Sequence, residues 1–439
     1  METDIGLDES LPVTESLFLG LDFSTQQIKA VVINYEQEVQ HEASVQFDND
    51  FPEYRTHGGV LVSTDDNSCV TAPVQMWVKA VDVLLDKLRI EGVDFSKISA
   101  LSGAAQQHGT VYWKKGTEEI LKSLDPTKFL HLQLDNRFTE KLGPPVFAGS
   151  VLGNIGNYFV ERYGFDEGCK VVAFTGDNPS SLAALCLRPG DVAISLGTSD
   201  VVFVSMNDFN PCTSGGANIL AHPFQEDAIM GLLCFKNGSV PRDRIKTEYT
   251  GDDWKIFSQL LDCSPPGNYG NIGFFFDNEE IIPPYLQGNH FFNTDGVAVS
   301  RFTSNEVYVR ALVEGQFLSR RLHAQRIGFT CGPCSRVLAT GGASQNTALL
   351  QVMSDVFNSP VYTMDVFNSA ALGAAYRAKS AMVPEKPFLE AIKEPVLKLV
   401  CTPVEDAAIV YSPMLARYAK LEGKLIAELR HGPENGTKG

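Results

Sequence analysis

Short apolar runs alternate with longer segments of helical spacing along most of the chain. Apolar runs at 17–21, 28–33 and 98–101 predict buried strands, and apolar positions three and four residues apart over 76–88 predict a helix. Strand and helix patterns that alternate in this order are typical of an α/β fold.

The second half of the chain repeats this alternation more regularly. Apolar runs of three to five residues predict strands, and periodic segments predict helices. The predicted strands are 171–174, 192–196, 201–205, 337–339 and 361–363, and the predicted helices are 180–187, 306–327 and 347–357. The longest helix is predicted to be amphipathic, with an apolar face made of Val309, Leu312, Val313, Phe317 and Leu322.

One pattern occurs twice, about 170 residues apart. LGLDFSTQQI at 19–28 and AISLGTSDVV at 193–202 each contain a strand, a short polar turn and a second strand. Duplicated strand–turn–strand units at this spacing predict two similar domains that face one cleft. We place the first domain at 17–150 and the second at 151–425.

Composition narrows the kind of protein and its partners. A chain of 439 residues is too long for one ordinary core, which also favours two domains. A net charge of −17 argues against nucleic acid and anionic membranes as partners. Nine dispersed cysteines, no signal-peptide pattern and no apolar run near 18 residues favour reduced thiols and a cytoplasmic location.

The two polar turns are candidate phosphate sites. Turns rich in Gly, Ser and Thr offer backbone N–H groups and hydroxyls to phosphate oxygens. Asp22 ends an apolar strand, where an unpaired carboxylate is costly, and a bound Mg²⁺ would explain it. The alternative is a pair of ordinary β-turns, with Asp22 accepting from a backbone N–H. No P-loop or Rossmann glycine motif is present in the sequence.

Other polar positions follow predicted strands. Gly341 and Gly342 would let a flat ligand approach the backbone closely, although a plain strand–helix turn is the alternative. Asp177 also follows a strand, where ligands bind in open α/β sheets, and could accept a hydroxyl proton. The alternative for Asp177 is a helix N-cap.

Three neighbouring polar side chains could hydrogen-bond a polyol. Gln106 and His108 follow the strand at 98–101, and Asn178 stands beside Asp177. A structural role is the alternative for His108.

Together these segments resemble a known family. LGLDFSTQQIKAVV, VAISLGTSDVVFV and LATGGASQNTALLQVMSDVFNSPVY resemble the phosphate and adenosine motifs of FGGY carbohydrate kinases. SGAAQQHG and AFTGDNPSSLAAL resemble their sugar-contacting segments, and the pair is similar to animal xylulose kinases. The resemblance covers about 17–422. It implies two ribonuclease H-like domains of the actin/hexokinase-like ATPase fold, which face an interdomain cleft.

The resemblance also implies an activity and a site. The activity would be ATP-dependent phosphorylation of D-xylulose to D-xylulose 5-phosphate, or of another ketose or polyol, by a monomer that uses ATP and Mg²⁺. Asp177 would be the general base, and His108, Asn178 and Gln106 would contact the sugar. Asp22 would lie by the metal. The implied ATP-binding residues are Ser24, Thr25, Gly197, Thr198, Ser199, Trp254, Gly341, Gly342 and Asn346.

The chain departs from the family pattern in its first domain. Only 68 residues separate His108 from Asp177, and a longer family segment with sugar contacts is absent, with a junction near 135–138. The first domain is therefore predicted to be truncated. Because lost sugar contacts mean lost positioning, the alternative function is a catalytically weak or inactive nucleotide-binding protein.

Cys331-Gly332-Pro333-Cys334 suggests a further alternative, a thiol redox protein. That chemistry needs the first cysteine at a helix N-terminus after a strand. Here a predicted helix precedes the motif and a strand follows it, so we interpret it as a turn.

Overall fold

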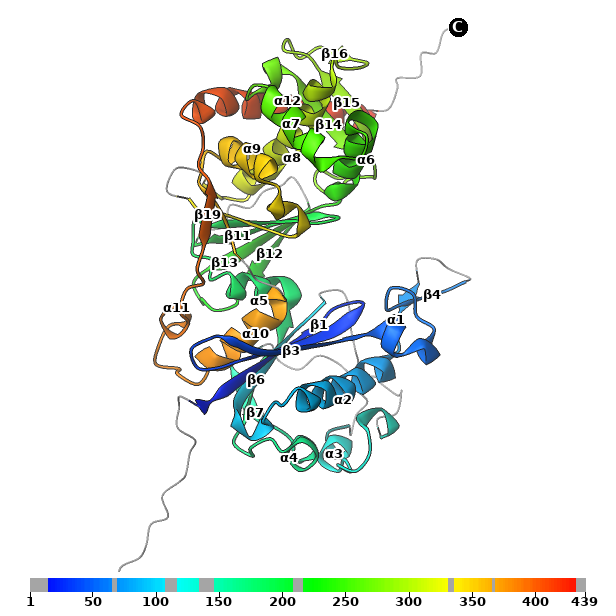
Figure 1. Cartoon of the computed structure of the whole chain (residues 1–439), viewed down its shortest axis with the longest axis vertical. Helices are drawn as coiled ribbons and strands as arrows, with labels where there is room; N and C mark the ends of the chain where they lie inside the picture. The colour runs from blue at the N-terminus through cyan, green and yellow to red at the C-terminus, as the bar shows by residue number, and fades with distance from the viewer. Residues whose placement is uncertain are drawn as a thin grey trace, which may run out of the picture. The chain divides into compact units, whose positions relative to one another are not determined.

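The chain forms two compact units (Figure 1). Unit 1 comprises residues 1–186, 223–225 and 366–395, and unit 2 comprises 187–222, 226–365 and 396–439. The computed structural model describes residues 15–64, 69–106, 117–133, 146–207, 216–330, 335–364 and 368–431.

Unit 1 is built on a seven-stranded sheet. Its first three strands form an antiparallel meander, β6 pairs parallel with β1, and both β8 and β9 pair parallel with β6. The order is β3-β2-β1-β6-β8-β7, and β9 lies beside the end of β6. The strands are β1 (Leu17–Phe23), β2 (Gln27–Ile33), β3 (Val39–Gln46), β6 (Ile98–Ala105), β7 (Val151–Asn154), β8 (Lys170–Val172) and β9 (Thr175–Gly176), with a separate pair β4 (Leu61–Val62) and β5 (Val70–Thr71).

Alternating side chains give this sheet two cores, one on each face. Leu19 and Ile28 pack with α2 and α4, whereas Phe18 and Val31 pack with α5 and α10. Figure 1 shows these two helix layers on opposite sides of the sheet. The helices of unit 1 are α1 (Phe47–Asp50), α2 (Val74–Ile90), α3 (Thr117–Lys122), α4 (Asn157–Tyr163), α5 (Asp177–Ala184), α10 (Ser369–Ser380) and α11 (Phe388–Ala391).

Helix α10 joins unit 1 from a distant part of the sequence, and glycines permit its close packing. A Cβ atom on Gly20 would lie 1.9 Å from the Ala371 carbonyl oxygen, and one on Gly373 would lie 1.8 Å from the Ser180 carbonyl oxygen. Because no side chain fits at either position, α10 can pack directly against β1 and α5.

The compact units differ from the domain boundary at 150/151 that we derived from sequence. Residues 151–186 lie in unit 1, because β8 and β9 pair with β6. Residues 366–395 also lie in unit 1, because α10 packs on β1.

Unit 2 repeats the sheet plan of unit 1. Strands β13-β11-β10-β17-β18 follow the same antiparallel and parallel pattern as β3-β2-β1-β6-β8. The two-domain α/β prediction with ribonuclease H-like sheets is therefore confirmed. The strands are β10 (Val192–Leu196), β11 (Asp200–Met206), β12 (Ala217–Ala221), β13 (Ile229–Phe235), β17 (Val337–Thr340), β18 (Val361–Thr363) and β19 (Lys398–Cys401), with a second sheet of β14 (Ile272–Phe276), β15 (Gly288–Phe292) and β16 (Ala298–Val299).

The longest predicted helix corresponds to α8, but the prediction that it is amphipathic is wrong. Side chains around its whole circumference are buried, including Arg310, Glu314 and Arg320. The charges are accommodated by ion pairs, such as Arg310 Nη1 to Glu314 Oε1 at 3.1 Å. The helices of unit 2 are α6 (Ser239–Thr250), α7 (Trp254–Cys263), α8 (Asn305–Arg326), α9 (Thr347–Phe357) and α12 (Ala407–His431).

The Cys331–Cys334 tetrad lies outside the described residues. Its neighbours follow the predicted order, since α8 ends before it and β17 begins after it.

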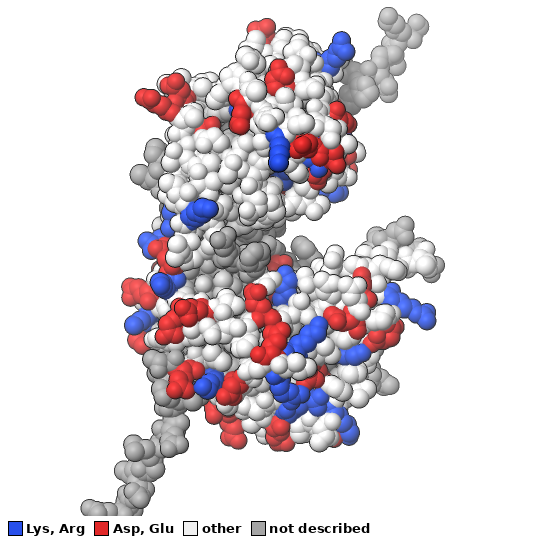
Figure 2. Space-filling model, viewed as in Figure 1, with Lys and Arg blue, Asp and Glu red and all other residues white. Residues whose placement is uncertain are grey.

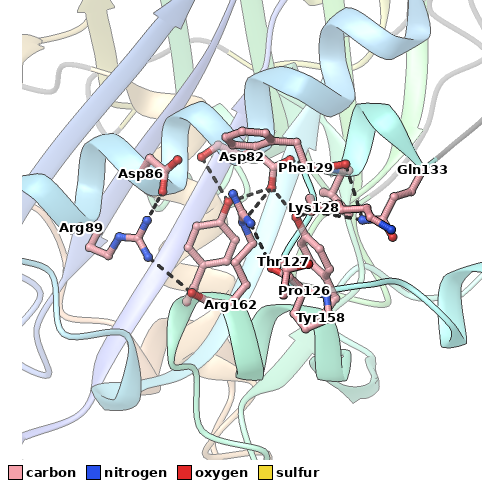
Figure 3. A network of polar contacts seen from close by, with 12 residues as sticks. Asp82, Asp86, Arg89, Pro126, Thr127, Lys128, Phe129, Gln133, Tyr158 and Arg162 are labelled. Atoms are coloured by element: carbon pink, nitrogen blue, oxygen red, sulfur yellow. Dashed lines mark hydrogen bonds and ion pairs between the residues drawn. The ribbon is translucent and has the colours of Figure 1, made fainter.

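A buried carboxylate on α2 organises the helical layer of unit 1 (Figure 3). Asp82 is fully buried and accepts hydrogen bonds from Leu130 N at 2.6 Å, Tyr163 OH at 2.7 Å and Tyr158 OH at 3.0 Å. The Arg162 guanidinium approaches to 3.9 Å from the same carboxylate. Asp82 therefore ties α2 to α4 and to the segment that contains Leu130.

Arg162 strengthens this connection from α4. Its Nη1 donates to the Pro126 carbonyl at 3.0 Å, and its guanidinium lies 4.5 Å from the Phe129 ring centroid (Figure 3). The segment 125–133 is thus fixed by polar contacts as well as by apolar packing. The predicted junction at 135–138 follows this segment and lies outside the described residues.

We expect Asp82→Ala to destabilise unit 1 by roughly 2–4 kcal/mol, because three buried donors lose their acceptor. Denaturant unfolding measures this change. The matched control is Asp86→Ala on the same helix, whose pairing with Arg89 is partly exposed and worth about 1 kcal/mol at most. Equal losses in the two variants would contradict the role given to Asp82.

Candidate active site

In unit 1, three predicted site residues lie at or just beyond the ends of neighbouring parallel strands. Asp22 lies near the end of β1, Gln106 follows β6, and Asp177 follows β9. The strand register pairs Asp22 with Ala104 and Ala104 with Thr175, so the three residues come to one edge of the sheet. This is the carboxyl edge, where open α/β sheets bind ligands.

The first polar turn is joined to β6 by a side-chain hydrogen bond. Thr25 Oγ1 donates to Gln106 Oε1 at 2.7 Å, and Ser24 N donates to Gln27 O at 3.0 Å across the turn. Gln106 was predicted to contact the sugar, whereas here its side chain also orients Thr25. His108 lies outside the described residues.

Asp22 is a buried and incompletely bonded carboxylate. It is 4% exposed, and Ser24 Oγ donates to its Oδ2 at 2.7 Å. Among the described residues, Oδ1 has no hydrogen-bond partner. Burial raises the pKa of Asp22 above its ordinary value, although the Ser24 hydrogen bond and the nearby Lys29 charge act in the opposite direction. Asp22 Oδ1 accepts no hydrogen bond from a backbone N–H of the described residues. Because burial makes the ionised carboxylate unfavourable, a nearby cation would stabilise it.

Asp177 begins helix α5. Gly176 is the N-cap and Asp177 is the first helical residue, so the alternative that Asp177 is the N-cap is wrong. Its Oδ1 accepts from Asn178 N at 2.8 Å, and both side chains are half-buried. A carboxylate in the first turn of a helix is stabilised by the helix dipole. Asp177 is therefore held at the sheet edge while part of it remains accessible.

Unit 2 contains a pocket of about 860 Å³. That volume suits a nucleotide-sized ligand. Five predicted ATP-binding residues from three separate parts of the chain line it: Gly197, Thr198, Trp254, Gly342 and Asn346. The other two from unit 2, Ser199 and Gly341, are sequence neighbours of lining residues and are not themselves part of the lining.

Gly341 shapes one wall of this pocket through its backbone. Its φ of 82° and ψ of 174° are accessible only to glycine, and a Cβ atom would lie 2.6 Å from the Leu196 carbonyl oxygen. The chain can therefore turn sharply from β17 across the end of β10. This close approach places Gly342 and Asn346 at the pocket.

Asn346 connects two walls of the pocket. It is the N-cap of α9, since its Oδ1 accepts from Ala348 N at 3.1 Å and Leu349 N at 3.2 Å. Its Nδ2 donates to Ser258 Oγ on α7 at 3.1 Å. The Asn346 amide is thus fixed before any ligand arrives.

The second polar turn presents its backbone N–H groups in a defined direction. The Gly197 carbonyl accepts from Ser239 N at 2.9 Å, and the Thr198 carbonyl accepts from Gly238 N at 3.2 Å. Carbonyl and N–H point in opposite directions across a trans peptide bond. The amides of Thr198 and Ser199 therefore point away from the start of α6.

The sequence interpretation missed several residues that line the pocket. They are polar or charged and come mainly from α6 and α7: Ser239, Arg242, Lys255, Ser258 and Gln259. Helical periodicity could have indicated Ser258, since it lies one turn after Trp254 on α7. Nothing in the sequence around Arg242 distinguishes it from Arg244, which forms a salt bridge with Asp277 instead.

Two negative findings apply to the described residues alone. No group of three or more His, Cys, Asp or Glu side chains there could hold a metal, and none of the helices found there is both long and apolar enough to cross a membrane.

On the face drawn in Figure 2, acidic and basic side chains are interspersed over the described surface.

Comparisons with known proteins give the family. Residues 192–382 match the model of the C-terminal domain of the FGGY family of carbohydrate kinases. The chain is 39% identical to a xylulose kinase of Rattus norvegicus, with 94% of this chain and 98% of the rat protein covered. It is 32% identical to xylulose kinase 2 of Arabidopsis thaliana, with 97% and 100% covered.

The alignment with the rat protein is longer than this chain. It spans 530 positions, whereas the chain has 439 residues, so at least 91 aligned positions have no residue here. A shortened chain was expected, and the junction near 135–138 stays a prediction.

Solved structures show the same fold at low identity. A ligand-bound xylulose kinase of Lactobacillus acidophilus has a TM-score of 0.74 and 15% identity, with 94% of this chain and 99% of that chain covered. A glycerol kinase of Plasmodium falciparum with ADP has a TM-score of 0.67 and 12% identity, with 94% and 98% covered. The predicted actin/hexokinase-like ATPase fold is confirmed. With relatives above 30% identity aligned over nearly their whole length, the chain belongs to the FGGY family of carbohydrate kinases.

Proposed function

We propose that this protein phosphorylates D-xylulose with ATP to give D-xylulose 5-phosphate. The observation that carries the proposal is the pocket of unit 2, which gathers Gly197, Trp254, Gly342 and Asn346 from separate segments of the chain. The xylulose kinases among its relatives support the sugar, and membership of a kinase family supports ATP.

Unit 2 would bind the nucleotide. Trp254 is 37% exposed at the pocket, and Lys246 Nζ lies 5.1 Å from its ring centroid. An indole ring can stack on a base and contributes about 1–3 kcal/mol when it does. The amides of Thr198 and Ser199 would then receive phosphate oxygens, and Asn346 would meet the adenosine.

Unit 1 would supply the groups for phosphoryl transfer. Catalysis of this reaction is mostly positioning and charge stabilisation, with a base that accepts the proton of the attacking hydroxyl. Asp177 is the proposed base, because it lies at the carboxyl edge of the sheet and stays partly accessible. Asn178, Gln106 and His108 are the proposed sugar contacts.

Asp22 is the proposed carboxylate for Mg²⁺. Its buried Oδ1 has no partner among the described residues, and Mg²⁺ is usually held by one or two carboxylates together with substrate phosphates. The residues present therefore fit the ion. When bound, Mg²⁺ would neutralise charge on the phosphates, while Ser24 keeps Asp22 oriented through the bond to Oδ2.

A second candidate function is a nucleotide-binding protein with weak or no turnover. The observation in its favour is the gap of at least 91 positions against the rat relative. Lost sugar contacts would reduce positioning without affecting the pocket of unit 2.

An ADP-release assay with purified chain, ATP and D-xylulose separates the kinase from the nucleotide-binding alternative. Turnover near or above about 1 per second supports the kinase, and nucleotide binding without turnover supports the alternative.

We expect Asp177→Asn to lower kcat by about 10²–10⁴-fold, because the amide cannot accept the hydroxyl proton. Isothermal titration should show unchanged ATP affinity. Glu161→Gln, an exposed carboxylate on α4 of the same unit, is the control and should leave kcat unchanged. Full turnover in Asp177→Asn would exclude Asp177 as the base.

We expect Trp254→Ala to weaken ATP binding about 10-fold or more, since base stacking is lost. Calorimetry with ATP measures the change. Ile256→Ala is the control, because Ile256 is 42% exposed on the same helix and does not line the pocket. If both variants bound ATP like the wild type, stacking on Trp254 would be ruled out.

We expect Asp22→Asn to raise stability at neutral pH while it abolishes Mg²⁺-dependent turnover. The folded pKa of Asp22 is raised, so its ionised form is less favourable in the folded chain than in the unfolded chain. The loss of folding stability caused by ionised Asp22 grows as the pH rises from the ordinary pKa of Asp and is complete above the raised pKa. The stability difference should therefore narrow as the pH falls toward the ordinary Asp value of 3.8.

Asp48→Asn is the control of opposite sign in denaturant unfolding. The Asp48 carboxylate accepts a hydrogen bond from Thr56 Oγ1 at 2.6 Å and another from Gly58 N at 2.6 Å. These bonds lower the pKa of Asp48. Asp48→Asn should therefore lose stability at neutral pH. A loss of stability in Asp22→Asn as well would contradict the burial penalty assigned to Asp22.

A further inference from the structure

A buried guanidinium lies directly beneath the second polar turn. Arg242 on α6 is 1% exposed, and Asp200, the first residue after the turn, is fully buried. Arg242 Nη2 donates to Asp200 Oδ1 at 2.8 Å, and Nη1 donates to Asp200 Oδ2 at 3.1 Å. A two-bond pair of this kind fixes distance and direction together.

The same guanidinium also holds the beginning of the turn. Its Nη2 lies 3.3 Å from the Gly197 carbonyl oxygen, which Ser239 N also approaches. Gly197 and Asp200 flank Thr198 and Ser199, whose amides would meet phosphate. The Arg242 side chain therefore hydrogen-bonds to both ends of the second polar turn. Arg242 is part of the pocket lining, and its Nε has no partner among the described residues.

Two side chains of helix α8 hydrogen-bond to Arg242, to Asp200 and to the residue before α6. Gln316 Oε1 accepts from Arg242 Nη1 at 3.0 Å, while Gln316 Nε2 donates to the Gly238 carbonyl at 2.9 Å. Arg320 Nη2 donates to Asp200 Oδ2 at 3.0 Å. All of these side chains are buried, so none can shift without leaving a polar group unsatisfied.

We propose that Arg242 is a positioning residue for the triphosphate: it fixes both ends of the second polar turn, so that the amides of Thr198 and Ser199 are aligned for phosphate oxygens before the nucleotide binds. The inference rests on the proposed function, since it assumes that the pocket of unit 2 takes a nucleoside triphosphate. It adds a residue that acts on the phosphates through the backbone.

Arg242→Lys tests geometry at constant charge. A lysine has one ammonium group and cannot bridge both Asp200 oxygens, Gln316 and the Gly197 carbonyl. We expect kcat/KM for ATP to fall about 10- to 100-fold. Affinity for adenosine, which has no phosphates, should not change, and neither should KM for the sugar. Calorimetry with ATP and with adenosine gives the decisive comparison.

Arg244→Lys on the same helix is the matched control. Arg244 also makes a two-bond pair, with Asp277 at 2.8 Å for both bonds, but it does not line the pocket. It should bind ATP and adenosine like the wild type. Gln316→Met is a second test variant that removes the acceptor of Arg242 Nη1 without a change of charge. It should weaken ATP binding less than Arg242→Lys does.

The outcomes are distinguishable. Normal ATP affinity in Arg242→Lys overturns the inference and leaves the proposed function intact. Equal losses for ATP and adenosine also overturn it, because they indicate collapse of the whole pocket. If the wild type itself fails to bind ATP, the proposed function fails and the inference fails with it.

Discussion

The parallel pairing of a hairpin strand with the next strand along the sheet is the constraint on which both units depend. β1 pairs with β6 in unit 1, and β10 pairs with β17 in unit 2. Parallel strands bring their carboxyl ends to one edge, where the backbone hydrogen bonds of the sheet stop. The polar turns that follow β1 and β10 therefore lie beside the residues that follow β6 and β17. This pairing explains why Asp22 and Gln106 share one edge, and why Gly341 meets Leu196 in the other unit.

Rigid support for these edges comes from different sources in the two units. In unit 1, glycines bring α10 into direct contact with β1 and α5, so backbone packs against backbone. In unit 2, the second turn rests on buried hydrogen bonds between Asp200, Arg242 and Gln316. A buried ion pair contributes little net stability, but breaking it by moving one partner leaves an uncompensated buried charge. The glycines of unit 1 therefore fix helix α10 on the sheet, whereas the hydrogen bonds of unit 2 fix the second polar turn itself.

Buried charge in this protein has two distinct uses. Asp82 is a fully buried carboxylate that accepts hydrogen bonds from Leu130, Tyr158 and Tyr163, and it connects α2 to α4. Asp22 is nearly as buried, but its Oδ1 lacks a partner among the described residues, and burial raises its pKa. Asp22 also lies at the carboxyl edge of the sheet, and this position together with the unpartnered oxygen supports the proposed cation site.

The sequence by itself determined the strands whose apolar residues are continuous, the helix at 347–357 and the repeated hairpins, since local periodicity carries that information. It did not predict β3, whose side chains are mostly polar and exposed and whose strand geometry comes from pairing with β2. It also misjudged α8, because charged residues look exposed in a sequence unless their partners are known. Only the tertiary structure assigned α10 to unit 1 and placed Arg242 at the second polar turn. Both depend on contacts between residues far apart in the chain, and local pattern does not record such contacts.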